Sequence, residues 1–252
     1  MHRNSNDVQN CLTGKTALVT GAAHGIGRAI ASALAAEGCN LHLICLHALP
    51  ELTAFSARLE NTYGISCTAH AVDVADPDAV DQYFAAVIPQ LDLLINNAGM
   101  AHLGLLQDMQ PAEWNRLLST NLSSVFYTSR LAIPLFLQKE SGCIINISSV
   151  WGQAGAAFET AYSASKGGVD ALTRALAKEL APNHIPVNAI SCGCVDTRMN
   201  DCLDDETKQG LIAEIPADRF AEPEEIAAAV VQLAKMPAYL TGQIIQVAGG
   251  WI

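Results

Sequence analysis

Short runs of apolar residues recur along the chain, and segments of helical character separate them. The runs have the length of β-strands and are apolar at nearly every position, as in Leu93-Leu94-Ile95 and Ile144-Ile145. Strands that are apolar on both faces belong to a parallel sheet covered by helices on both sides. We therefore expect an α/β fold with seven parallel strands, at residues 15–20, 41–46, 66–72, 92–96, 143–148, 186–191 and 243–248.

Glycine and proline mark the boundaries of several expected helices. Gly38 ends the first helix, and Pro223 with its neighbouring glutamates begins the last one. Pro111 begins a long helix that we expect to run to about Leu137, with a bend at Pro134.

The chain of 252 residues shows no repeat, linker or low-complexity run. We therefore expect one domain over 1–252, preceded by a polar extension at 1–13. Residues 193–216 form a long connection after a strand, and such connections often cover a binding site, so we expect a substrate lid there.

Composition limits the partners of the protein. Lys and Arg number 14 against 25 Asp and Glu, so the net charge is −11, which argues against binding to nucleic acid or to an anionic membrane. Hydrophobic residues make up 50% and charged residues 15%, which favours an oligomer. No apolar stretch has the length of a transmembrane helix or signal core, so we expect a cytoplasmic protein. We expect the eight cysteines to be reduced thiols, and we expect no metal site.

A glycine turn follows the first strand and leads directly into a helix. It reads G-x-x-x-G-x-G over residues 21–27. Glycines allow a tight turn and a close approach to a pyrophosphate, while the helix N-terminus offers unpaired N–H groups. The alternative is an ordinary glycine-rich turn between a strand and a helix. The candidate cofactor-binding residues here are Gly21, Ala23, His24, Gly25, Ile26 and Gly27.

Polar residues also end the third and fourth strands. Asp73 and Val74 follow the third, and Asn97, Ala98 and Gly99 follow the fourth. Ligands of open parallel sheets bind beyond the carboxyl ends of the strands, so these signals converge on one crevice. Together they predict a Rossmann-type, doubly wound sheet that binds a dinucleotide.

The choice of dinucleotide depends on the end of the second strand. A carboxylate there would bind the ribose diol of NAD(H), but the segment reads Ile44-Cys45-Leu46-His47. The missing carboxylate favours NADP(H) over NAD(H), with His24, His47 or Arg28 as partners of the phosphate. His24 is equally consistent with an ordinary loop histidine.

Three further residues fit the chemistry of carbonyl reduction. Ser149 ends the fifth strand, and Tyr162 and Lys166 lie four residues apart on the following helix, so they share a face. A lysine ammonium beside a phenol favours the phenolate, and lowering the pKa of a phenol from about 10 toward neutrality takes about 4 kcal/mol. Such a tyrosine can protonate the oxygen of a carbonyl that receives hydride. A surface pair on an amphipathic helix is the alternative for Tyr-x-x-x-Lys alone.

With these motifs, the chain resembles the short-chain dehydrogenases/reductases from Lys15 to Ile252. The resemblance implies a catalytic tetrad of Asn121, Ser149, Tyr162 and Lys166, in which Asn121 holds a bend in its helix and a water. It also implies that Val195 and Thr197 contact the cofactor, and that the protein is a homotetramer or homodimer. Cys192-Gly193 departs from the Pro-Gly usual in the family.

Within the family, the tail after Leu240 is similar to that of 3-oxoacyl-acyl-carrier-protein reductases. Those enzymes dock an acidic carrier through basic residues, whereas this chain has Glu140 and Asn183 at the corresponding places. The segment 148–162 more closely resembles reductases that act on 5-aminopentanone carried by a lysine of elongation factor P.

That narrower resemblance leads to a substrate hypothesis. Glu159, together with Asp201, Asp204 or Asp205 of the lid, would receive a terminal ammonium, and Trp151 would line the substrate site. The alternative is that Glu159 only favours its helix N-terminus.

The sequence therefore predicts an NADP(H)-dependent reductase that converts a small or carrier-bound ketone to a secondary alcohol. Dehydrogenases of hydroxysteroids or sugar alcohols within the same family, and a non-catalytic dinucleotide-binding protein, remain as alternatives.

Overall fold

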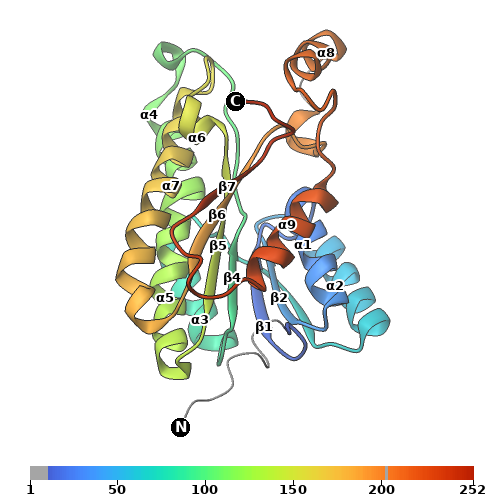
Figure 1. Cartoon of the computed structure of the whole chain (residues 1–252), viewed down its shortest axis with the longest axis vertical. Coiled ribbons are helices and arrows are strands. Elements are labelled where there is room, and N and C mark those ends of the chain that lie inside the picture. Colours follow the sequence, from blue (N-terminus) through green and yellow to red (C-terminus); the bar gives the residue numbers. More distant parts are fainter. Residues whose placement is uncertain (1–10, 202–203) are drawn as a thin grey trace.

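The computed structural model describes residues 11–201 and 204–252, and a seven-stranded parallel sheet forms its centre (Figure 1). The strand order is β3-β2-β1-β4-β5-β6-β7, and every pair of neighbours is parallel. This confirms the expected doubly wound fold. The strands are β1 (Thr16–Thr20), β2 (Asn40–Cys45), β3 (Cys67–Ala71), β4 (Leu93–Asn96), β5 (Cys143–Ser149), β6 (Val187–Cys192) and β7 (Ile244–Val247).

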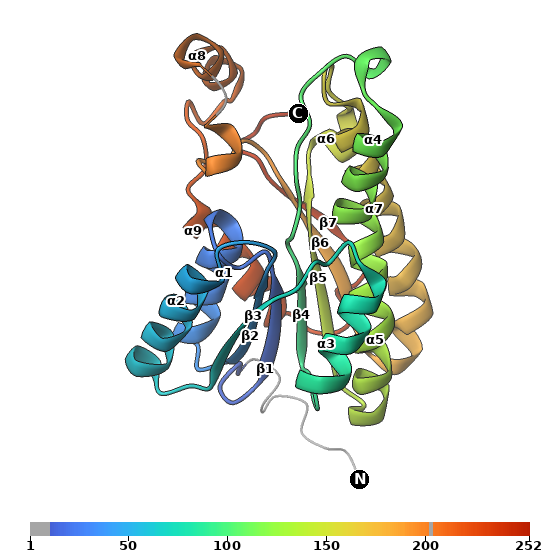
Figure 2. The ribbon, with the colours of Figure 1, turned by 180° about the vertical axis from the view of Figure 1, so that it is seen from behind.

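Helices cover both faces of this sheet, as the apolar strands require. Figures 1 and 2 show α1, α2 and α9 on one face, and α3, α4, α5 and α7 on the other. The helices are α1 (Gly25–Ala36), α2 (Leu49–Tyr63), α3 (Pro77–Val87), α4 (Pro111–Leu118), α5 (Ser124–Lys139), α6 (Trp151–Ala154), α7 (Thr160–Leu180), α8 (Asp205–Glu214) and α9 (Pro223–Ala234).

The central strands divide the core into two clusters. In β1, Ala17 and Val19 pack in the cluster that contains Ile30 of α1, whereas Leu18 packs on the opposite side with Phe136 of α5. Successive side chains of a strand point to opposite faces, so an apolar strand stabilises both layers. All five of these side chains are fully buried.

The expected long helix after Pro111 is interrupted. The chain forms a π-helical turn, η2 (Ser119–Ser123), between α4 and α5, and α5 then continues through Pro134. The departure from α-helical geometry therefore lies at η2, where the resemblance places Asn121. Such single π turns often occur at functional sites.

The expected lid contains more regular structure than a loop. It includes the 3₁₀ turn η4 (Arg198–Asn200) and helix α8, which projects beside the carboxyl ends of the strands (Figure 2). Residues 202–203 of the lid, and 1–10 of the polar extension, lie outside the described residues. Within the described ranges, no helix is both long enough and apolar enough to span a bilayer. The seven cysteines of these ranges are free thiols.

Candidate active site

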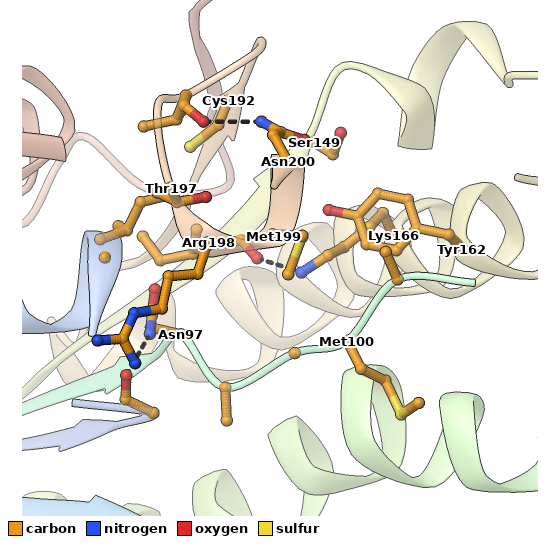
Figure 3. A pocket seen from close by; sticks show the side chains of 18 of the residues that line it. Asn97, Met100, Ser149, Tyr162, Lys166, Cys192, Thr197, Arg198, Met199 and Asn200 are labelled. Atoms are coloured by element: carbon orange, nitrogen blue, oxygen red, sulfur yellow. Dashed lines mark hydrogen bonds between the residues drawn. The ribbon is translucent and has the colours of Figure 1, made fainter. Parts of the chain in front are cut away.

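A large cavity opens at the carboxyl ends of the strands, where a parallel sheet places its loops. Its volume is about 1210 Å³, and Figure 3 shows it from close by. Most of the candidate residues from the sequence line this cavity, whereas Gly27, Arg28 and Asn121 are not among its lining residues. The lining candidates are Gly21, Ala23, His24, Gly25, Ile26, Asp73, Val74, Asn97, Ala98, Gly99, Ser149, Trp151, Glu159, Tyr162, Lys166, Val195 and Thr197.

The glycine turn requires glycine for steric reasons. Gly21 has φ of +66°, and a Cβ on it would lie 2.9 Å from Ala98 Cα. A Cβ on Gly27 would lie 2.3 Å from the carbonyl oxygen of Gly21. Thr20 Oγ1 accepts hydrogen bonds from the backbone N–H groups of Asn97 and Ala98, both at 2.9 Å. The turn and the loop after β4 therefore form one fixed cradle, into which side chains at these glycines would intrude.

The cradle fits a dinucleotide. Helix α1 begins at Gly25, and His24 at its N-cap makes no side-chain cap hydrogen bond. The first backbone N–H groups of α1 therefore face the cavity without side-chain partners from the cap, as pyrophosphate binding requires.

Asp73 lines the cavity and is paired with Arg116 of α4. The two Nη atoms donate to the carboxylate at 2.8 and 3.3 Å. Burial opposes ionisation, but the hydrogen bonds from Arg116 and from the Ala75 N–H outweigh it and hold the pKa of Asp73 below its ordinary value. Asp73 is therefore an anionic acceptor at neutral pH.

The three candidate phosphate partners have different surroundings. His24 and His47 line the main cavity, and His24 Nε2 lies 2.7 Å from the Glu51 carboxylate. Arg28 lines a neighbouring groove instead, where its guanidinium donates to the Ala23 carbonyl at 3.1 Å and lies 4.0 Å from the centre of the Phe55 ring. A phosphate bound at His24 would therefore compete with the Glu51 carboxylate for the His24 ring nitrogen.

Ser149, Tyr162 and Lys166 come together as the sequence predicts. β5 ends at Ser149, and α7 places the other two on one face (Figure 3). Lys166 Nζ lies 5.6 Å from the centre of the Tyr162 ring and donates to the Ile147 carbonyl at 2.8 Å. Ser149 lines the cavity together with Tyr162, and its hydroxyl favours the ionised form of the Tyr162 phenol, which lowers the pKa of that phenol in part.

Asn121 lies behind this group, in η2. Its Oδ1 accepts from Met100 N–H at 2.8 Å, and its Nδ2 donates to the Met100 carbonyl at 2.9 Å and to Ser165 Oγ at 3.1 Å. A Cβ on Gly99 would lie 3.4 Å from Asn121 Oδ1 and 3.6 Å from Lys166 Nζ, so the two side chains flank the same glycine. The four residues of the implied tetrad thus share one site.

The pKa of Tyr162 differs from the sequence expectation. Burial raises the pKa of this phenol, and the hydrogen bond from Ser149 lowers it only in part. Burial also lowers the pKa of Lys166 to about 8, against the opposing effects of Cys192 and Asp170. Desolvation therefore outweighs the hydrogen bonding that favours the phenolate of Tyr162.

Trp151 and Glu159 line the opposite side of the cavity, together with Trp251 from the chain terminus. The two indole rings lie edge to face, with their centres 4.8 Å apart. The Trp151 side chain acts as a hydrogen-bond donor toward the Glu159 carboxylate. Burial raises the pKa of Glu159, and this hydrogen bond lowers it in part.

The lid aspartates of the substrate hypothesis lie elsewhere. Asp201 lines the neighbouring groove, and Asp204 caps α8 by accepting from Thr207 N–H at 2.8 Å. Glu159 is therefore the member of that group that the structure places in the main cavity.

Val195 and Thr197 begin the lid. Val195 is buried, and its carbonyl accepts from Asn200 Nδ2 at 2.8 Å. Thr197 packs against Gly25, where an added Cβ would lie 3.1 Å from Thr197 Cγ2. Thr197 therefore lies beside the start of α1 and the cradle.

The cavity also contains residues that sequence reasoning did not include. Arg198 and Met199 directly follow Thr197, and Met100 directly follows Gly99, so extending the motifs by one or two residues would have found them. Arg116 reaches Asp73 over 43 positions, and no local pattern indicates such a pair. These additional lining residues include Met100, Leu103, Arg116, Thr120, Arg198 and Met199.

Comparison with known proteins agrees with this geometry. The sequence profile of the family described as short chain dehydrogenase matches residues 15–208. The chain belongs to the short-chain dehydrogenase family. It is therefore an oxidoreductase that uses NAD(P) and acts on CH–OH or C=O groups.

Relatives in this family span nearly the whole chain. It is 36% identical over 238 residues to the uncharacterised oxidoreductase YmfI of Bacillus subtilis, which covers 94% of this chain and 98% of that protein. It is 41% identical over 240 residues to 3-oxoacyl-[acyl-carrier-protein] reductase FabG of Staphylococcus aureus, with 94% and 97% covered.

A solved short-chain dehydrogenase shows the same fold. A protein of Beutenbergia cavernae, assigned as an NAD(P)-dependent gluconate 5-dehydrogenase and crystallised with NADP, superposes with a TM-score of 0.90 at 34% identity. The superposition covers 96% of this chain and 98% of that protein.

Proposed function

We propose that this protein is an NADP(H)-dependent reductase that converts a ketone to a secondary alcohol. One observation carries the proposal: Ser149, Tyr162 and Lys166 meet in the same cavity as the glycine cradle. A bound nicotinamide dinucleotide supplies the hydride in this chemistry.

The side chains account for the remaining steps. Ser149 and Tyr162 hydrogen-bond the carbonyl oxygen, and the Tyr162 hydroxyl donates its proton as negative charge develops there. The Lys166 ammonium, held by the Ile147 carbonyl, stabilises the phenolate that remains. Asn121 fixes the loop after β4 behind Lys166, and we expect a water beside it to return the proton.

The preference for NADP(H) rests on the end of β2. Cys45, Leu46 and His47 line the cavity there and provide no carboxylate that would repel a 2′-phosphate. His24 and His47 can donate hydrogen bonds to such a phosphate. At His24 the negative charge of the neighbouring Glu51 disfavours phosphate binding. The Beutenbergia structure with NADP is consistent with this choice.

We further propose a ketone with a terminal ammonium as the substrate, of which 5-aminopentanone on elongation factor P is the specific candidate. Glu159 provides a carboxylate in the cavity, and Trp151 and Trp251 provide aromatic faces that attract a cation. An acidic acyl carrier would be repelled by Glu140 and by the net charge of −11, so this chain is poorly suited to bind one.

The test is a substrate panel with purified protein. Oxidation of NADPH and of NADH is followed with a neutral short ketone, an aminoketone and a 3-oxoacyl thioester. We expect kcat/KM for NADPH to exceed that for NADH by about tenfold or more, since one charge-assisted hydrogen bond contributes about this much. We expect the aminoketone to be preferred, and a preference for the thioester would overturn the substrate assignment.

A further inference from the structure

Asp170 is a buried carboxylate to which neither the motifs nor the proposed chemistry assigns a role. It lies on α7 one helical turn after Lys166, and it is 2% exposed. Its Oδ1 accepts from Ser148 Oγ at 2.6 Å. Its Oδ2 is buried without a hydrogen-bond partner among the residues that the structure describes. Burying a charged carboxylate costs free energy unless the charge is paired and hydrogen-bonded.

The Ser148 to Asp170 bond is part of a repeated contact between β5 and α7. Successive residues of β5 contact functional residues of α7. The Ile147 carbonyl accepts from Lys166 and the Ser148 hydroxyl donates to Asp170, while Ser149 lines the same cavity as Tyr162. Asp170 therefore belongs to the contact that fixes the two catalytic elements against each other.

The charges around Lys166 identify what Asp170 contributes. Cys192 faces Lys166 from β6, while Tyr162 and Asp170 face it from α7. Burial raises the pKa of Cys192 to about 12, so this thiol is neutral at neutral pH. Burial also raises the pKa of Asp170, whereas the Ser148 hydrogen bond, Arg174 and Lys166 lower it. Asp170 is thus the group that can supply negative charge to the buried ammonium.

We propose that Asp170 is a positioning residue for the catalytic pair, which holds α7 against β5 through Ser148 and keeps Lys166 in its ammonium form. The inference rests on the proposed roles of Tyr162 and Lys166. Removal of the carboxylate charge lowers the pKa of Lys166, because a nearby negative charge stabilises the ammonium form. The titration of Lys166 therefore moves to lower pH.

The first test measures the Lys166 ammonium without any turnover. The chain has six lysines, so their ¹⁵N-labelled Nζ signals can be followed by NMR as a function of pH, with Lys166 assigned from Lys166→Met. In Asp170→Asn, which keeps the shape of the side chain, we expect the pKa of Lys166 to fall by about one pH unit. Glu179→Gln removes the same charge from an exposed position of the same helix and should leave it unchanged.

The second test uses the pH profile of ketone reduction. We expect the basic limb of kcat/KM to move to lower pH in Asp170→Asn by a similar amount, while activity at the acidic end of the plateau is retained. Ser148→Ala removes the hydrogen bond that favours the charged form of Asp170. It should lower both the pKa of Lys166 and the pH of the basic limb of kcat/KM, by a smaller amount than Asp170→Asn does. This variant provides the test if Asp170→Asn does not fold.

An unchanged Lys166 titration in Asp170→Asn would overturn the role of Asp170, whatever the enzyme reduces. A shifted titration in a protein that reduces no ketone would support the role of Asp170 and would instead overturn the proposed function.

Discussion

Lys166 and Glu159 show how burial and charge compete at single residues. Burial lowers the pKa of Lys166 to about 8, so the ammonium still predominates at pH 7. Burial raises the pKa of Glu159, but a Trp151 hydrogen bond favours its charged form. A cationic ligand beside Glu159 would favour that form further, so the substrate side of the cavity is suited to a positive charge.

The variant Glu159→Gln tests this substrate side directly. It keeps the size and a hydrogen-bond acceptor for Trp151 but removes the charge. We expect KM for an aminoketone to rise by about tenfold, the effect of losing one charge-assisted contact, with little change for a neutral ketone. Steady-state kinetics on both ketones provides the comparison. Equal effects on the two substrates would contradict the assignment.

The glycine turn is the element whose sequence and geometry agree most closely. The sequence predicted a tight turn at these glycines, and Gly27 shows the closest approach of the backbone within it. The Cβ of any other residue there would lie 2.3 Å from the Gly21 oxygen, so the turn or α1 would have to move.

The variant Gly27→Ala should therefore weaken cofactor binding. We expect the Kd for NADPH, measured by fluorescence titration, to rise by about tenfold or more, and the free energy of unfolding to fall by about 1–3 kcal/mol. Gly210→Ala in α8, where an added Cβ meets nothing within 4 Å, is the matched control. It should leave the Kd for NADPH unchanged and raise the free energy of unfolding by about 1 kcal/mol, because alanine favours a helix interior over glycine. Unchanged NADPH binding in Gly27→Ala would show that the cradle is not where the pyrophosphate lies.

Helices α5 and α7 are joined through β4 and β5 by a buried chain of polar side chains. Thr128 Oγ1 donates to Asn96 Oδ1 at 2.7 Å, Asn96 Nδ2 donates to Asn146 Oδ1 at 2.9 Å, and Asn146 Nδ2 donates to Thr173 Oγ1 at 2.8 Å. Asn146 is fully buried, so its partners have no water to replace it.

The variant Asn146→Leu should remove this connection. We expect the free energy of unfolding in urea to fall by about 2–4 kcal/mol, because buried groups of Asn96 and Thr173 lose their partners. Asn61→Leu, at an exposed position of α2, should change it by less than about 0.5 kcal/mol. A small effect of Asn146→Leu would mean that the connection contributes little to stability.

At the scale of the whole molecule, the sequence predicted the sheet better than it predicted the helices and the charges. The seven expected strands agree with the structure to within one residue at every end, because short apolar runs bounded by turns and separated by helical segments indicate buried strands. The interruption at η2 has no local breaker such as Pro134, and it depends on the contacts of Asn121. The raised pKa of Tyr162 depends on burial by segments far apart in the sequence.

The resemblance also implies an oligomer, and α5 has an exposed apolar surface that suits one. Phe126 is 51% exposed and Leu137 is 41% exposed on this helix. We expect light scattering to give a mass two or four times the 26.6 kDa of the chain. Phe126→Asp should increase the subunit dissociation constant by about tenfold or more, since it would place a charge in the expected apolar interface. Tyr63→Asp, at an exposed position of α2 on the opposite face of the sheet, should leave the subunit dissociation constant unchanged. A monomeric wild-type protein would contradict the prediction.

The most direct test of the central claim compares ketone reduction by the wild-type protein and by Tyr162→Phe, at saturating NADPH and under conditions where both bind the cofactor equally. The account predicts that kcat falls by about 1,000-fold while the Kd for NADPH and the unfolding midpoint stay the same, because only the proton donor is lost. An unchanged kcat in Tyr162→Phe would contradict it.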